Sequence, residues 1–286
     1  MAGSLSNVQS SYHVHSNSLP SGPHRITSEV DQHLSRLRSS QATSRSSSSS
    51  SSICLEINGL QDLHDCVDKL LQLPLTHQAL GQEQQNKLVN ELLNGSLRIL
   101  DVSSIAKDVL LQTKECAQEL SSVLCRRWGD EISSEVKKYL TSRKAIKKTM
   151  KKALKGMVNK CSSRISEEHE SVTKLTEVKA ITFAVFESLF SLISGPMCTS
   201  SKLSGRYLVS KLMQSKRIAC EEEESDINEF VKVDAALIAH KTSTSDNIIQ
   251  VLKELELNIQ DLEDGLESLS RHLIKSRVSL LNILNN

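Results

Sequence analysis

Near the C-terminal end of the chain, apolar residues recur at alternating intervals of four and three positions, from Ile248 through Leu252 to Leu273. This heptad spacing places the apolar side chains on one side of an α-helix that packs along its whole length against other helices. The pattern predicts one long helix that continues to Leu284. Its seam can face helices of the same chain or a second copy. The candidate seam residues are Leu255, Ile259, Leu262, Leu266, Leu269 and Leu273.

Helical spacing of apolar residues also fills the middle of the chain. A first helix is expected over Leu60–Leu73, because the residue before Pro74 disfavours the helical conformation, and Thr76 is the expected cap of the next helix. Ser171–Ser194 is apolar on most sides in its second half, which predicts the central helix. The other helices are expected at about 78–128, 129–169, 202–222 and 226–240.

The composition agrees with a helical fold. Aromatic residues make up only 3% of the chain, so a core must be built from Leu, Ile, Val and Ala. Only four Pro occur, and the long stretches without Pro permit long helices. No strand-like alternation competes with the helical pattern. The predicted fold is therefore an all-α, elongated helical bundle of five to seven helices.

The N-terminal part has a different composition. Residues 1–52 are polar and rich in Ser, and they end in a run of Ser at 46–52. Such a segment buries too little apolar surface to offset the entropy of ordering it. We therefore expect residues 1–52 to be a disordered low-complexity segment, with at most a short helical turn around Val30–Leu37. Residues 53–286 are expected to form the helical bundle domain.

A strongly basic stretch lies at 137–157, with nine Lys or Arg and no acidic residue. On a helix, its apolar residues share one side and its lysines the other. One interpretation is a solvated helix face; the other is a surface for an anionic membrane or an acidic, calmodulin-like protein. Because the net charge is only +1 and Tyr139 is its one aromatic residue, the stretch argues against nucleic-acid binding. The candidate surface residues are Lys144, Lys147, Lys148, Lys151, Lys152 and Lys155.

The last predicted helix carries most of the complementary charge. Acidic residues there outnumber Lys253, the single basic residue among them. If this helix neighbours the basic one, the opposite charges can set the pairing of the two helices. The acidic residues are Glu254, Glu256, Asp261, Glu263, Asp264 and Glu267.

No motif for catalysis, a cofactor or a metal ion is present. The sequence lacks phosphate-binding glycine loops, a nucleophile elbow and an H-E-x-x-H pair. The seven Cys are odd in number and contain no C-x-x-C pair, which argues against a disulfide framework or a zinc site. We therefore expect a protein without enzymatic activity, catalytic residues, cofactor or metal.

The sequence also indicates where the chain resides. The first 30 residues lack the apolar core of a secretory signal. The most apolar window, Ala180–Ser194, contains Glu187 and is too short to cross a bilayer. These features predict an intracellular protein, either cytoplasmic or peripheral to a membrane, with no transmembrane helix.

Several long blocks resemble the BYPASS-type family, a plant-specific family of helical proteins of unknown function. The blocks include "GLQDLHDCVDKLLQLPLTHQAL" at 59–80, "LVNELLNGSLRILDVSSIAKDVLLQTKECAQEL" at 88–120 and "RHLIKSRVSLLNILNN" at 271–286. The resemblance covers nearly the whole chain and implies an all-helical, non-enzymatic protein that acts in root and shoot development. It supplies no site residues and no named protein partner.

The resemblance extends to the N-terminal segment with one informative departure. The family pattern R-S-x-S-L-P corresponds here to residues 15–20, which makes Ser18 a candidate phosphosite. His15 stands where the family has Arg. Because a neutral His is a poorer partner for phosphate, the departure argues against capture of phosphorylated Ser18 by a phosphoserine-binding protein of the 14-3-3 type.

Overall fold

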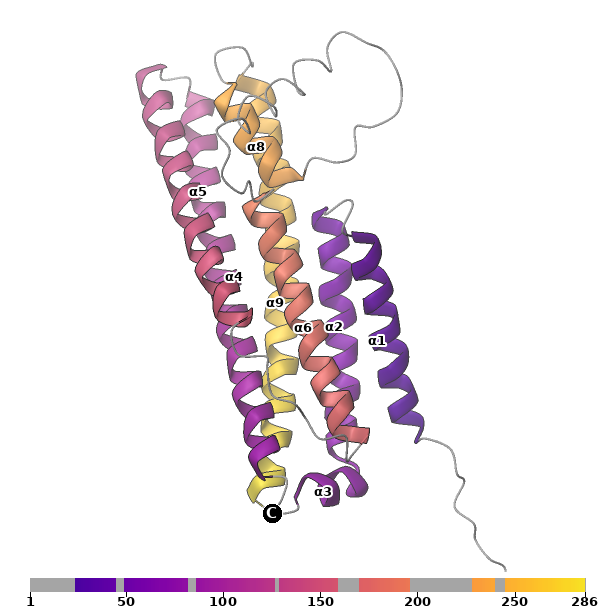
Figure 1. Ribbon diagram of the computed structural model, residues 1–286. Coiled ribbons are helices and arrows are strands. Elements are labelled where there is room, and N and C mark those ends of the chain that lie inside the picture. Colours follow the sequence, from indigo (N-terminus) through magenta and orange to yellow (C-terminus); the bar gives the residue numbers. More distant parts are fainter. Residues whose placement is uncertain are drawn as a thin grey trace, which may run out of the picture.

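The computed structural model describes residues 24–44, 49–81, 86–126, 129–158, 170–195, 228–239 and 245–285. All regular elements in these ranges are α-helices, which lie side by side in an elongated bundle (Figure 1). The all-α prediction is confirmed. The helices are α1 (Arg25–Ser44), α2 (Ser50–Leu71), α3 (Pro74–Leu80), α4 (Asn86–Arg126), α5 (Gly129–Val158), α6 (Glu170–Ser194), α8 (Glu229–Ile238) and α9 (Ser245–Asn285).

Helix α9 runs the length of the bundle. Its 41 residues agree with the long helix that the heptad pattern predicts. It packs chiefly against α4 and α2, and also against α8 and α3. All the seam residues are buried, with at most 2% of their surface exposed. The seam therefore forms part of the core of the chain itself.

Helix α6 occupies the central position expected for it. It packs against α1, α2, α4, α5 and α8. Phe186 and Phe190 are fully buried on its apolar second half. The helix ends at Gly195, which adopts a positive φ of 70° and donates its backbone N–H to the carbonyl of Leu192. This left-handed conformation suits Gly because it has no Cβ.

The boundary between α2 and α3 corrects one detail. Leu73, not Thr76, is the cap of α3, and Pro74 is the first helical residue. Proline fits this position because the first helical N–H has no partner within the helix and the fixed φ of Pro is already helical. Thr76 lies inside α3 and is buried.

The expectation of a disordered N-terminal segment is wrong for much of its length. Residues 25–44 form α1, and α2 begins at Ser50 with Ser49 as its cap. Val30, Leu34 and Leu37 recur at helical spacing and are buried against the bundle. Three apolar residues on one line can dock a polar helix onto an existing surface, although they cannot form a core alone. Residues 1–23 and 45–48 lie outside the described residues.

Helix number and limits differ slightly from the expectation. The described residues form eight helices rather than five to seven, because α1 is added and α3 is separate from α4. The third predicted helix is described to Val158, and α8 starts at Glu229 with Asn228 as its cap. The helix predicted at 202–222 lies outside the described residues.

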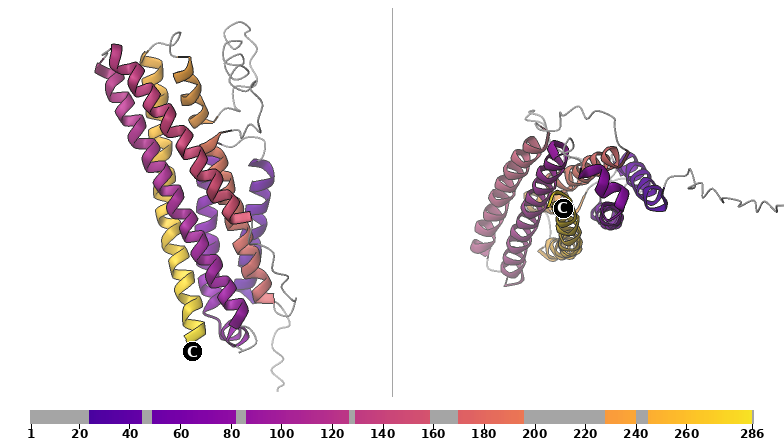
Figure 2. Two further views of the ribbon diagram at one scale, coloured as in Figure 1. Left: turned by 60° about the vertical axis from the view of Figure 1, so that its left-hand side comes forward. Right: turned by 90° about the horizontal axis from the view of Figure 1, so that it is seen from below.

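Charge pairing between the basic helix and the last helix required the two helices to be neighbours, and α5 and α9 are not close neighbours. Helix α4 lies between α5 and α9 (Figure 2) and packs closely against both. Two acidic residues of α9, Glu263 and Glu267, instead pair with lysines of α4. Lys107 pairs with Glu267 at 3.0 Å, and Lys114 pairs with Glu263 at 2.8 Å.

Candidate interaction site on helix α5

Helix α5 lies at the outer edge of the bundle (Figures 1 and 2). Lys147 is partly buried, and the other five candidate lysines are exposed. Within the described part of the chain, none of these five has an ion-pair partner, whereas Lys147 pairs with Asp234 at 3.1 Å. We call the six residues the α5 basic face. Its members are Lys144, Lys147, Lys148, Lys151, Lys152 and Lys155.

A buried arginine holds α5 against the rest of the bundle. The Arg143 side chain is only 3% exposed, and its Nε lies 3.1 Å from Oδ1 of Asp234 on α8. Its Nη2 donates a 2.6 Å hydrogen bond to the backbone carbonyl of Ile193 at the end of α6. The guanidinium also stacks over the Phe230 ring at 5.4 Å. One side chain therefore joins three helices.

The end of α6 receives these contacts for a physical reason. The last carbonyls of a helix have no partner within it and carry partial negative charge. Arg143 donates a hydrogen bond to the Ile193 carbonyl, and the Asn228 side-chain amide donates one to the Leu192 carbonyl at 3.0 Å. The Asn228 side chain also accepts the Val231 N–H at 2.9 Å and so caps α8. The junction of α5, α6 and α8 is thereby held in a defined geometry.

Tyr139 lies one turn before Arg143 and is also buried. Removal from water raises the pKa of its hydroxyl well above the usual value, and the nearby Arg143 charge opposes this shift. Among the residues that the structure describes, the Tyr139 hydroxyl and Nη1 of Arg143 have no hydrogen-bond partner. Tyr139 and Arg143 therefore lie on the buried side of α5, whereas Lys144, Lys148, Lys151, Lys152 and Lys155 are exposed.

In the sequence, Arg143 is one of the nine Lys and Arg residues of the basic stretch at 137–157. Its position was nevertheless a usable signal. Arg143 follows Tyr139 by four residues and precedes Ile146 by three, so it falls on the buried line of α5 rather than among the lysines. An Arg on an apolar line predicts a buried pair with an acid, although the distant partner Asp234 cannot be read from local spacing.

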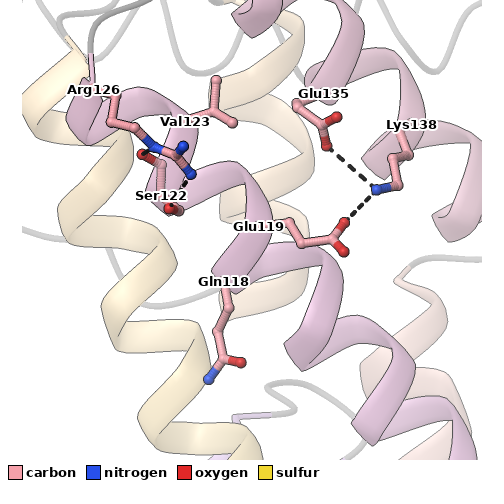
Figure 3. Close-up of a pocket in the computed structure, with 7 residues that line it drawn as sticks. All are labelled: Gln118, Glu119, Ser122, Val123, Arg126, Glu135 and Lys138. Atoms are coloured by element: carbon pink, nitrogen blue, oxygen red, sulfur yellow. Dashed lines mark hydrogen bonds and ion pairs between the residues drawn. The ribbon is translucent and has the colours of Figure 1, made fainter.

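A shallow groove lies between α4 and α5 (Figure 3), and no residue of the α5 basic face is among those that line it. Its volume is about 370 Å³. Lys138 crosses it and pairs with Glu119, and with Glu135 at 3.7 Å. Its hydrogen bond to Glu119 raises the pKa of Lys138. The Arg126 guanidinium bonds to Ser122. The Lys138–Glu119 pair joins α5 to α4, whereas the Arg126–Ser122 contact lies within α4.

The remaining predicted sites are placed as follows. The α9 seam residues Leu255, Ile259, Leu262, Leu266, Leu269 and Leu273 are buried within the chain and are not on its surface. Ser18 lies outside the described residues. In the ranges that the structure describes, no group of His, Cys, Asp or Glu could hold a metal ion. No helix there is long and apolar enough to cross a membrane.

Comparison with known proteins assigns the chain to a family. The family model described as Protein BPS1 matches residues 56–283. The chain belongs to this family. The match confirms the resemblance to BYPASS-type proteins, a plant family of unclear function. No curated protein and no solved structure matches the chain.

Proposed function

We propose that this BPS1-family chain is a non-enzymatic helical interaction protein that binds an acidic protein partner through the α5 basic face. The observation that supports it best is the set of exposed lysines without ion-pair partners among the described residues. Elsewhere the long helices pair many of their cations, as with Lys107, Lys114 and Lys138. The family resemblance extends the proposal to a role in root and shoot development.

The geometry of the α5 basic face suits an extended acidic partner. Lys144, Lys148, Lys151 and Lys155 follow each other by four, three and four residues, so they form one line on the helix. At a rise of 1.5 Å per residue, this line is about 16 Å long. The Arg143 junction fixes α5 in place, so little conformational freedom of its backbone is lost on binding.

An anionic membrane surface is the second candidate partner. The same line of lysines on an outer helix fits a peripheral contact, since each Lys or Arg near an anionic surface contributes about 1 kcal/mol. Such binding falls steeply with added salt because its charges are exposed to solvent. In this form the protein is a peripheral, membrane-associated regulator.

The deciding experiment compares two charge-matched variants. The test variant carries Lys144→Gln, Lys148→Gln, Lys151→Gln and Lys155→Gln. The control variant removes four exposed cations elsewhere, through Lys87→Gln, Lys232→Gln, Lys253→Gln and Arg271→Gln. Both are used in affinity capture from plant tissue with mass spectrometry, and in co-sedimentation with vesicles with and without phosphatidylserine.

The two candidates give different results. Loss of a captured protein in the test variant alone supports the acidic protein partner. Loss of vesicle binding in the test variant alone, at low salt, supports the membrane form. Identical results for both variants and the wild type would remove the α5 basic face as a functional surface.

A further inference from the structure

Helix α1 docks on the bundle through a narrow apolar contact. It packs against α2 and α6. Val30, Leu34 and Leu37 are its fully buried apolar residues. Leu37 lies so close to Gly59 of α2 that a Cβ added there would come within 3.0 Å of its Cδ2. With so few apolar side chains, the polar contacts of α1 weigh heavily in whether it stays docked.

The last turns of α1 hold a buried carboxylate on α2. Glu56 is only 1% exposed. Its Oε1 accepts a 3.2 Å hydrogen bond from the Ser40 hydroxyl, and its Oε2 accepts a 2.6 Å hydrogen bond from the Gln41 amide. A buried carboxylate requires donors of this kind, because burial without them is costly. The Ser40 hydroxyl is thus a donor that Glu56 uses only while α1 is docked.

Two arginines precede this serine. Arg36 and Arg38 lie four and two residues before Ser40. Arg36 is exposed, and Arg38 pairs with Glu177 of α6 at 3.1 Å with its side chain still 54% exposed. We propose that Ser40 is a phosphorylation site for a serine/threonine kinase that selects basic residues before its target, and that its phosphate releases α1 from α2 and α6.

The reaction uses ATP as phosphoryl donor. The Ser40 hydroxyl oxygen bonds to the γ-phosphorus of ATP, the bond from that phosphorus to the β,γ-bridging oxygen breaks, and ADP leaves. The hydroxyl proton passes to the kinase base and then to water. The kinase reaches Ser40 when the end of α1 opens locally, as helices held by few buried contacts do.

The phosphate then prevents α1 from docking again. A phosphoserine carries a charge of about −1.5 to −2 and offers acceptors where the hydroxyl was a donor. Placed against Glu56, it leaves the buried carboxylate with one donor fewer and a like charge beside it. Ser39 provides the contrast, because it is exposed and its hydroxyl donates to the Ser35 carbonyl of its own helix.

Release of α1 leaves the rest of the bundle in place. The family match begins at residue 56, after α1. The α9 seam contacts α2 and α4, and α1 is not among the close neighbours of α9. The face of α2 and α6 that receives Leu34 and Leu37 would become available to a competing amphipathic helix. This surface is separate from the α5 basic face, so the inference goes beyond the proposed function.

The test uses the full chain and hydrogen exchange measured by mass spectrometry. Ser40→Glu is expected to raise the exchange of α1 amides about tenfold or more, with α9 amides unchanged as the check on folding. Ser39→Glu adds the same charge one residue away and is expected to leave α1 protected. In the double variant Ser40→Glu/Glu56→Gln, the repulsion is removed and protection of α1 is expected to return.

The modification is tested directly as well. The wild-type chain is incubated with a basophilic kinase and ATP, and the modified residue is located by fragmentation. Phosphate at Ser40 with faster exchange in α1 supports the proposal. Absence of phosphate at Ser40 would overturn it. A chain that is phosphorylated at Ser40 but keeps α1 protected from exchange would also overturn it. That result would mean that the phosphate lies in solvent beside Arg36 and does not displace α1. Equal effects of Ser39→Glu and Ser40→Glu would also overturn it.

Discussion

Arg143 of α5 and Asp234 of α8 form a buried ion pair, with 3.1 Å between Nε and Oδ1. Burial makes the pair sensitive to loss of one partner, because the remaining charge is left uncompensated. Asp234→Ala is expected to lower the free energy of unfolding by about 3–5 kcal/mol, measured by urea denaturation. The apolar double variant Arg143→Met/Asp234→Leu is expected to lower the free energy of unfolding clearly less than Asp234→Ala does. A double variant as unstable as Asp234→Ala would argue against the ion pair as the source of the effect.

The seam of α9 gives a second prediction, with a matched control on the same helix. Leu262→Ala and Leu266→Ala are each expected to lower the free energy of unfolding by about 2–5 kcal/mol, because each leaves a cavity in the core. Leu257 is 70% exposed, so Leu257→Ala is expected to change it by less than about 0.5 kcal/mol. If the seam variants instead altered only self-association, seen by analytical ultracentrifugation, the assignment of the seam to the core would fail.

Gly195, which follows the last residue of α6, has a positive φ and leaves little space for a side chain. A Cβ at this position would lie 2.7 Å from Cγ2 of Val231 on α8. Gly195→Ala combines left-handed backbone strain with this clash and is expected to destabilise the chain by about 1–3 kcal/mol. Thermal unfolding of Gly195→Ala and of Gly195→Ala/Val231→Ala separates the two causes. Adding Val231→Ala should restore only the part of the lost stability that the clash causes.

The buried imidazole of His64 makes stability depend on pH. Its Nε2 lies 3.1 Å from the Thr182 hydroxyl, and its Nδ1 has no hydrogen-bond partner in the described part of the chain. Burial, with a smaller contribution from His272, lowers the pKa of His64 from 6.5 to about 4. The unfolded chain therefore binds more protons between these values, so stability falls as pH falls from 6.5 toward 4.

The size of this effect follows from the shift. It lowers the free energy of unfolding by between about 3 and 4 kcal/mol at most, from about 1.4 kcal/mol per pH unit. His64→Gln is expected to flatten the dependence in this window when urea denaturation is repeated across pH. The lowered pKa of Asp65, caused first by its hydrogen bond to Lys69, acts only below its ordinary value of 3.8 and so leaves the window unaffected. An unchanged slope in His64→Gln would assign the dependence to other groups.

The sequence predicted the long-range architecture well where a strong period exists. The heptad line through Leu255 and Leu266 fixed both the extent of α9 and the face that it buries, because apolar periodicity records burial directly. The expectation for α1 was wrong because it rested on the polar composition of residues 1–52. The helical spacing of its three buried apolar residues was given less weight. Composition measures whether a segment can fold alone, whereas α1 folds against a surface made by α2 and α6.

The sequence predicted the exposed lysines of the candidate site but not the buried contacts of Arg143 that hold α5 in place. Lysine spacing showed which side of α5 faces solvent, but not which helix would lie beside it. Both α4 and α5 are complementary in charge to α9, and only the packing decides that Lys107 and Lys114 are the partners. The junction of Arg143, Asp234 and Ile193 joins residues far apart in the chain, so no local pattern reports it.

The position of α9 has a consequence for how the chain folds during synthesis. Helices α2 and α4 are made early, yet the surface that buries them is on α9, which is made after all the other described helices. Until α9 emerges, their apolar lines remain open to water and to other nascent chains. The core must then close through contacts between residues some two hundred positions apart, such as Gln61 and Gly265, which is a slow step for a helical protein. The most vulnerable moment for aggregation therefore comes while α2 and α4 wait for α9.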